Sequence, residues 1–149
     1  MRPKQQTPIH ILLADDDLDD HFFFKNALKE IPLATQLTTV NDGELLFAYL
    51  SHHSERLPDV LFLDLNMPRK NGSECLIEIK RDAKLNRIPV IIYSTCLQSE
   101  MADELYQKGA HYYLKKYDID ELPKYIQRVL VLLAENPNRP SRDKFIDIL

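Results

Sequence analysis

Short apolar runs that stop at a charged or polar residue are the feature that most limits how this chain can fold. Five such runs occur, at residues 9–14, 36–40, 59–63, 89–93 and 111–114. Four of them are nearly continuous in their hydrophobicity, whereas residues 36–40 form a weaker, Thr-rich run. Continuous apolar runs of this length are typical of strands that are covered on both faces.

Longer stretches of helical period separate these runs. Phe24, Ala27, Leu28 and Ile31 recur at i, i+3, i+4 and i+7, which gives one apolar helix face. The same spacing predicts further helices around residues 45–50, 75–79, 101–105 and 122–133. Asp118 or Asp120 is expected to cap the last of them.

This alternation predicts an α/β fold with one doubly wound parallel sheet and right-handed crossovers. In such a sheet, ligands bind beyond the carboxyl ends of the strands. We expect one domain over residues 9–134, preceded by an extension at 1–8 and followed by a tail at 135–149. The tail is too short to be an output domain.

Composition narrows the function classes for this chain of 149 residues. A net charge of −4 argues against a nucleic-acid-binding protein, because phosphate contacts need a basic surface. Two cysteines do not make a disulfide framework and fit a reduced compartment. No stretch reaches the ~20 apolar residues that a membrane span needs, so we expect a cytoplasmic protein without membrane contact.

The residues directly after the runs carry the chemistry. Three aspartates begin at Asp15, Asp64 follows the third run, Ser94 and Thr95 follow the fourth, and Lys115 and Lys116 follow the fifth. Clustered carboxylates raise one another's pKa unless a cation lies among them, and Mg²⁺ prefers such oxygen ligands. A carboxylate beside Mg²⁺ and a lysine is suited to attack phosphorus and form an acyl phosphate.

A plainer interpretation of residues 15–20 stays open at this point. Acidic residues are common at helix N-termini, where they interact favourably with the helix dipole. The inference of a phosphoryl site therefore depends on four strand ends together rather than on any single residue.

Four motifs in this order and spacing resemble the receiver domains of response regulators, the CheY-like superfamily. They are LLADDD at 12–17, LFLDLNMP at 61–68 with Asn71-Gly72, PVIIYS at 89–94 and GAHYYLKK at 109–116. The resemblance covers residues 9–133. It implies a flavodoxin-like (βα)5 sheet with strand order 2-1-3-4-5.

The resemblance also implies roles for individual residues. Asp64 matches the phosphate acceptor, and Asp15 and Asp16 match the acidic pair that binds Mg²⁺ or Mn²⁺, with Asp16 the direct ligand and Asp15 acting largely through water. Asn66 matches the position that offers its backbone carbonyl to the metal.

Further positions match the switch of the family. Ser94 corresponds to the hydroxyl that hydrogen-bonds the phosphoryl group, Lys116 to the phosphate-binding lysine, and Tyr113 to the aromatic residue that changes rotamer. Thr95 and Cys96 are candidate modulators. A small side chain at Cys96 would position attacking water poorly, so we expect a long-lived phosphoryl group.

One residue departs from the family pattern. A proline joined by a cis peptide usually follows the lysine, but here Tyr117 follows Lys116. A cis bond without proline costs about 3–4 kcal/mol, so either this bond is trans and the loop is rearranged, or the fold holds a strained cis bond.

The function implied is that of a bacterial single-domain response regulator in a two-component system or phosphorelay. Its partners would be a histidine kinase or histidine phosphotransfer protein and a downstream protein target; a homodimer stays open. The chain also resembles the regulators of bacterial phytochrome-type histidine kinases. Phe22, Phe23 and Phe24 cannot all face the core, and in the family this helix face helps to dock the phosphohistidine donor.

Three other functions compete with this one. A non-phosphorylated adaptor with the same fold would not need the full set of acids, serine and lysine. An aspartate-nucleophile phosphatase wants a second acid two residues after the nucleophile, and that residue is Asn66, so we expect no turnover enzyme. A flavin- or nucleotide-binding module would need a phosphate loop where this chain has acids.

Overall fold

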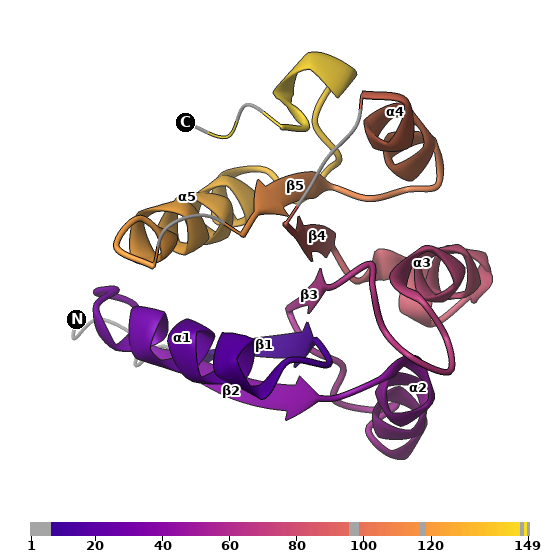
Figure 1. Ribbon diagram of the computed structural model, residues 1–149, viewed down its shortest axis with the longest axis horizontal. Helices are drawn as coiled ribbons and strands as arrows, with labels where there is room; N and C mark the ends of the chain where they lie inside the picture. Colours follow the sequence, from indigo (N-terminus) through magenta and orange to yellow (C-terminus); the bar gives the residue numbers. More distant parts are fainter. Residues whose placement is uncertain (1–6, 96–98, 117–118, 147, 149) are drawn as a thin grey trace, which may run out of the picture.

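Five parallel strands form one sheet in a computed structural model that describes residues 7–95, 99–116, 119–146 and 148. The strands lie in the order β2-β1-β3-β4-β5 (Figure 1), which confirms the predicted fold. Their bounds are Ile9–Ala14 for β1, Thr35–Val40 for β2, Val60–Leu63 for β3, Val90–Ser94 for β4 and Tyr112–Lys115 for β5.

Five α-helices connect and follow the strands. They are α1 (Leu18–Lys29), α2 (Gly43–His52), α3 (Gly72–Arg81), α4 (Ser99–Gln107) and α5 (Leu122–Glu135), with 3-10 turns at Leu85–Arg87 and Arg142–Lys144. In Figure 1, α1 and α5 cover one face of the sheet, and α2, α3 and α4 cover the other. Each face of the sheet is therefore buried, as the continuous apolar runs predict.

Side-chain caps begin the first three helices. The carboxylates of Asp17 and Asp42 and the amide of Asn71 each accept a backbone N–H of the first turn. The helix α5 begins after Glu121, which makes no side-chain cap bond, so the prediction of Asp120 as its cap is wrong. Asp118, the other predicted cap, lies outside the described residues.

Each face of the sheet has its own hydrophobic core. On the α1 and α5 face, Phe24 packs edge-on against Phe62 of β3, with ring centroids 4.9 Å apart. On the opposite face, Leu46 of α2 and Leu76 of α3 are fully buried over the same strands. Full burial of such side chains stabilises the fold by about 1.5–3 kcal/mol each, which fixes the central strands and the residues directly after them.

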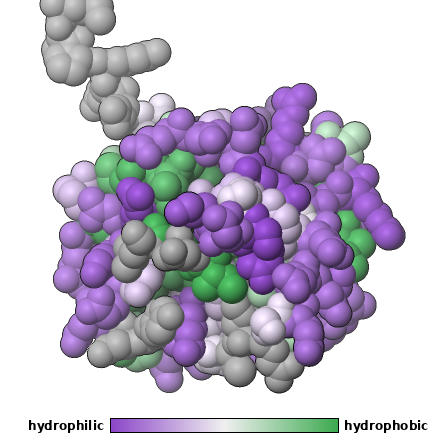
Figure 2. Space-filling model, turned by 90° about the horizontal axis from the view of Figure 1, so that it is seen from above, coloured by the Kyte–Doolittle hydropathy of each residue, from purple (hydrophilic) through white to green (hydrophobic). Residues whose placement is uncertain are grey.

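The segment after α5 returns to the sheet and covers the outer edge of β5. Phe145 is fully buried and packs edge-on against Tyr106 of α4, and its carbonyl accepts a hydrogen bond of 2.9 Å from the Tyr113 N–H. Ile148 is buried on the opposite face. Figure 2 views the molecule from this side, where the surface is mainly hydrophilic with small apolar areas. The segment thus shields an edge strand that would otherwise expose unpaired backbone groups.

His111 ties the beginning of this segment to the start of β5. Its Nε2 donates to the Pro137 carbonyl at 3.2 Å, and the Arg139 guanidinium lies 4.1 Å from the centre of the Tyr106 ring. Burial, and secondarily the positive charge of Lys80, lowers the pKa of the His111 ring to about 4. The ring is therefore neutral in the folded protein at neutral pH.

Removing the Phe145 side chain should destabilise the whole domain. Phe145→Ala is expected to lower the free energy of unfolding by about 3–5 kcal/mol, because it leaves a cavity in the core. The neighbouring Ile146 is 42% exposed, so Ile146→Ala should cost less than about 1 kcal/mol. Equal, small losses in urea unfolding for both variants would show that the segment is not part of the core.

Acid should weaken the fold through His111. The unfolded ring binds a proton near its ordinary pKa of 6.5, whereas the folded ring resists protonation down to about 4. The stability that His111 contributes is thus present above pH 6.5 and is lost as the pH falls to about 4, by up to about 3 kcal/mol.

Urea unfolding of the wild type and His111→Gln at pH 7 and pH 4.5 measures this loss. The stability advantage of the wild type should shrink at the lower pH. His52→Gln changes an exposed histidine and serves as the matched control, which should alter the free energy of unfolding by no more than about 0.5 kcal/mol. An unchanged advantage of the wild type over His111→Gln at pH 4.5 would contradict the assignment.

Candidate functional site

The residues directly after β1, β3 and β5 continue the hydrogen bonding of the sheet. The Asp15 N–H donates to the Val40 carbonyl at 3.0 Å, the Asp64 N–H to the Ala14 carbonyl at 2.9 Å, and the Lys116 N–H to the Ser94 carbonyl at 2.8 Å. Each backbone is held one residue beyond its apolar run. The side chains of Asp15, Asp64 and Lys116 therefore meet at the carboxyl edge of the sheet, as the sequence predicts.

Asp15, Asp16 and Asp64 form an acidic cluster at this edge. Each offers one carboxylate oxygen, and these oxygens lie within 4.8 Å of one another. Asp15 and Asp64 are buried, whereas Asp16 is exposed. Burial raises the pKa of Asp15 to about 7. Burial also raises the pKa of Asp64, and the negative charge of the nearby Asp16 raises it further. A cation among these oxygens would relieve both effects.

The geometry of Asp15 fits such a cation. Its Oδ1 accepts the Asp17 N–H at 3.0 Å, but its buried Oδ2 has no partner with hydrogen-bond geometry among the described residues, although Lys116 Nζ lies 2.8 Å away. A buried oxygen with spare accepting capacity is rare in proteins. Together with an all-oxygen donor set it suits a hard divalent ion such as Mg²⁺ or Mn²⁺.

Lys116 provides the positive charge of the site. Its Nζ lies 2.8 Å from Asp15, 2.7 Å from Asp20 and 3.6 Å from Asp64, and its side chain is 11% exposed. Burial acts to lower the pKa of this ammonium, but the nearby carboxylates of Asp15 and Asp20 outweigh it and hold the pKa above its usual value. Lys116 is thus charged and enclosed by carboxylates.

Asp20 is a member of the site that the sequence prediction missed. It lies on the first turn of α1 and accepts a hydrogen bond from Lys116 Nζ. A signal was present, because Asp20 is four residues before the buried Phe24 and so shares its sheet-facing side of the helix. The neighbouring aspartates concealed it, since five acids within residues 15–20 show no helical period of their own.

The same run also contains the capping role that the plainer interpretation assigns to it. Asp17 caps α1 and is exposed, whereas Asp15 and Asp20 point to Lys116. His21 adds a contact from α1, where its Nε2 donates to the Asp15 carbonyl at 2.6 Å. Residues 15–20 therefore serve both as a helix start and as part of the site.

The predicted switch residues lie on the adjacent strands β4 and β5. Ser94 and Tyr113 are buried, and the Tyr113 hydroxyl donates to the Ser94 carbonyl at 3.3 Å. The Asn66 N–H lies 3.4 Å from Asp64 Oδ1, while Thr95 is exposed. Cys96 and the peptide between Lys116 and Tyr117 lie outside the described residues.

Gly72 allows the loop after Asp64 to close tightly. Its N–H donates to the Leu65 carbonyl at 3.0 Å, and a Cβ at this position would overlap the Asp64 carbonyl and lie 2.8 Å from Leu65 Cα. The capping box of Asn71 and Glu74 then starts α3. The Asn-Gly pair thus brings a helix start against the backbone of Asp64.

Known proteins share both this sequence and this geometry. The sequence matches the response regulator receiver domain over residues 11–127. Response regulator Rcp1 of Synechocystis sp. is 30% identical over 146 residues, which cover 95% of this chain and 99% of Rcp1. The structure of the phosphorylated cyanobacterial phytochrome response regulator RcpA has a TM-score of 0.78 at 29% identity and covers 91% of this chain and 100% of that one. The Mn²⁺-bound form of Rcp1 has a TM-score of 0.76 at 30% identity, with coverage of 90% and 100%.

The chain belongs to the receiver domain family of response regulators, the phosphorylation switches of two-component signalling. The resemblance inferred from its four motifs is confirmed. Within the described residues, no helix has the length and apolar character that crossing a bilayer requires.

A side chain at position 72 should disturb the loop that holds Asp64. Gly72→Ala is expected to lower the free energy of unfolding by about 1–3 kcal/mol through overpacking, although Ala usually stabilises a helix relative to Gly. Ser73→Ala, which loses one hydrogen bond with Lys108, should cost about 1 kcal/mol or less. Urea unfolding measures both, and a Gly72→Ala protein as stable as the wild type would contradict the close approach.

Proposed function

We propose that Asp64 accepts a phosphoryl group from the phosphohistidine of a histidine kinase or histidine phosphotransfer protein. The observation that carries the proposal is a buried Asp64 carboxylate with Asp15, Asp16 and Lys116 around it at the edge of the sheet. The similarity to RcpA, whose structure is that of a phosphorylated protein, supports it.

The proposed chemistry is a direct transfer from the donor imidazole to Asp64. An oxygen of Asp64 attacks phosphorus, a P–O bond forms as the P–N bond to the donor imidazole breaks, and an acyl phosphate results. Lys116, whose Nζ is 3.6 Å from Asp64 Oδ1, is placed to neutralise charge on the transferred group. Asn66, at the position where a phosphatase would have its second acid, cannot protonate a leaving group, so we propose a switch and not a turnover enzyme.

We further propose that Asp15, Asp16, Asp64 and the Asn66 backbone carbonyl hold Mg²⁺. When bound, this ion supplies positive charge to the transferring phosphoryl oxygens. The Mn²⁺-bound form of Rcp1 supports a divalent ion, and the buried Asp15 Oδ2, which pairs with Lys116 but lacks hydrogen-bond geometry, supports its placement here.

Ser94 and Tyr113 are proposed to transmit the change. The Ser94 hydroxyl would hydrogen-bond the phosphoryl group and so bias two pre-existing states of the protein. Tyr113 contacts the Ser94 carbonyl through its hydroxyl and the Phe145 carbonyl through its N–H, which links the site to the far edge of the sheet. The output would be a changed contact with a downstream protein. Thr95 and Cys96 stay predicted modulators, and the long phosphoryl lifetime stays a prediction.

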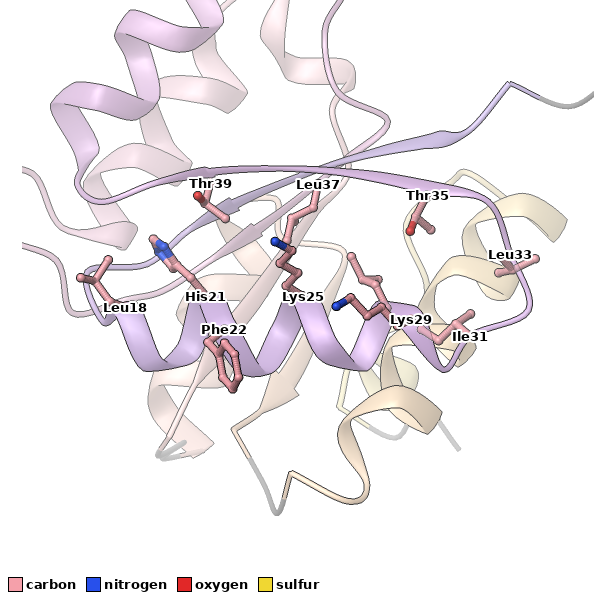
Figure 3. Close-up of a pocket in the computed structure, with 11 residues that line it drawn as sticks. Leu18, His21, Phe22, Lys25, Lys29, Ile31, Leu33, Thr35, Leu37 and Thr39 are labelled. Atoms are coloured by element: carbon pink, nitrogen blue, oxygen red, sulfur yellow. The ribbon is translucent and has the colours of Figure 1, made fainter.

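The donor is proposed to dock on α1. Leu18 and Phe22 are 69% and 60% exposed on the half of this helix nearest the site. They border a groove between α1 and β2, and Figure 3 shows Phe22 on the side of α1 turned away from β2. Because they are four residues apart, they share one face of the helix, and an exposed apolar face beside the site is a suitable docking surface for a donor.

The kind of kinase is inferred from the relatives. RcpA is a phytochrome response regulator, and we propose a phytochrome-type histidine kinase as the donor for this chain. A cytoplasmic location and a homodimer stay predictions of the sequence.

Phosphorylation by a small donor tests the function. Incubation with Mg²⁺ and acetyl phosphate should add one phosphoryl group in intact mass spectrometry, and Asp64→Asn should prevent it. Asp19→Asn, at an exposed carboxylate of α1, should react like the wild type, and EDTA should stop the reaction. No mass change in the wild type would favour the non-phosphorylated adaptor.

A further inference from the structure

Lys116 is directed toward helix α1 more than toward the phosphate acceptor. Its hydrogen bond with Asp20 Oδ2 measures 2.7 Å, whereas Asp64 Oδ1 is 3.6 Å away. The close contact with Asp15 lacks hydrogen-bond geometry. The well-formed hydrogen bond of this ammonium in the described site is therefore made to Asp20, a residue outside the predicted metal and acceptor set.

The groups around the Lys116 ammonium favour its position beside Asp20. Asp20 approaches from α1, while the ring of Tyr93 in β4 lies with its centre 5.1 Å from Nζ. The Lys116 and Asp20 side chains are 11% and 20% exposed, so water screens their attraction less than it would at an open surface. Moving the ammonium to a phosphoryl group on Asp64 would weaken or break this ion pair.

We propose that Asp20 is a positioning residue that holds Lys116 back from Asp64 and so opposes phosphorylation. The inference rests on the proposed function of Asp64, and it adds Asp20 as a competitor for the Lys116 ammonium. A carboxylate and a phosphoryl group attract the same ammonium, and the state of the switch depends on which of them keeps it. Asp20 therefore sets how readily the protein leaves its unphosphorylated state.

Substitution of Asp20 by its isostere tests the proposal. Asp20→Asn should raise the initial rate of phosphorylation by acetyl phosphate about two- to ten-fold, the range expected of a partly buried ion pair. The affinity for beryllium fluoride, an unreactive phosphoryl mimic, should rise in parallel in the presence of Mg²⁺. Disturbed folding would lower both quantities, so a rise cannot come from structural damage.

Two further variants distinguish loss of the Asp20–Lys116 contact from the change in the protein's net charge. Asp19→Asn makes the same charge change one residue away, on an exposed side chain, and should leave the rate within about two-fold of the wild type. Asp20→Glu keeps the carboxylate and should stay slower than Asp20→Asn. The gain of Asp20→Asn should persist at ~1 M salt, where the Debye length is about 3 Å and longer-range repulsion of the anionic donor is screened.

The outcomes distinguish the two proposals. A wild type that takes no phosphate overturns the function of Asp64 and this inference with it. A wild type that is phosphorylated while Asp20→Asn is unchanged, slower, or matched by Asp19→Asn overturns the role of Asp20 alone. If the faster phosphorylation of Asp20→Asn disappears at high salt, the role of Asp20 is also overturned, because the rate increase then comes from the change in overall charge.

Discussion

The ion pairs around the Lys116 ammonium are the interaction on which the functional edge of this protein depends. Two buried carboxylates, Asp15 and Asp64, lie at the ends of neighbouring strands, and burial raises the pKa of both. The ammonium of Lys116, directly after β5, offsets the negative charge of these carboxylates, although β5 is two strands away from β3 in the sheet. Removing one member of such a set leaves an uncompensated buried charge, which is costly. The central strands and the edge strand are therefore coupled by electrostatics as well as by hydrogen bonds.

The hydrophobic cores make this arrangement precise. Because β1 and β3 are covered on both faces, their register is fixed, and the residue directly after each strand has a fixed position. The backbone hydrogen bonds of Asp15, Asp64 and Lys116 then extend the sheet by one residue. Polar side chains are thus held by a rigid scaffold, as a site that must bind and release a phosphoryl group requires.

Much of this could be predicted from the sequence, because the signals were strong and local. Apolar runs located both ends of all five strands to within one residue, and the spacing of Phe24, Ala27 and Leu28 gave α1 its buried face. The acids and the lysine of the site were found because each directly follows a strand. Strand order came from the family resemblance, since pairing between distant segments leaves no local pattern.

The features that the sequence prediction missed depend on tertiary packing. Asp20 shares a helix face with Phe24, but its contact with Lys116 is evident only once α1 is placed against the end of β5. Glu121 precedes α5 without the side-chain cap that local rules favour. The segment after α5 has the composition of a linker, yet its Phe145 is fully buried in the core on the α2, α3 and α4 face of the sheet.

The hydrogen bond from the Tyr113 N–H to the Phe145 carbonyl has a consequence for recognition. A partner that lengthens the sheet at β5 must pair with the same backbone edge, so it competes with a segment that is already tethered to the molecule. Such a tethered competitor acts at a high effective concentration, whatever the concentration of the protein. A weak partner is therefore excluded from this edge, and a successful one must provide enough free energy to release Phe145 from the core as well as to bind.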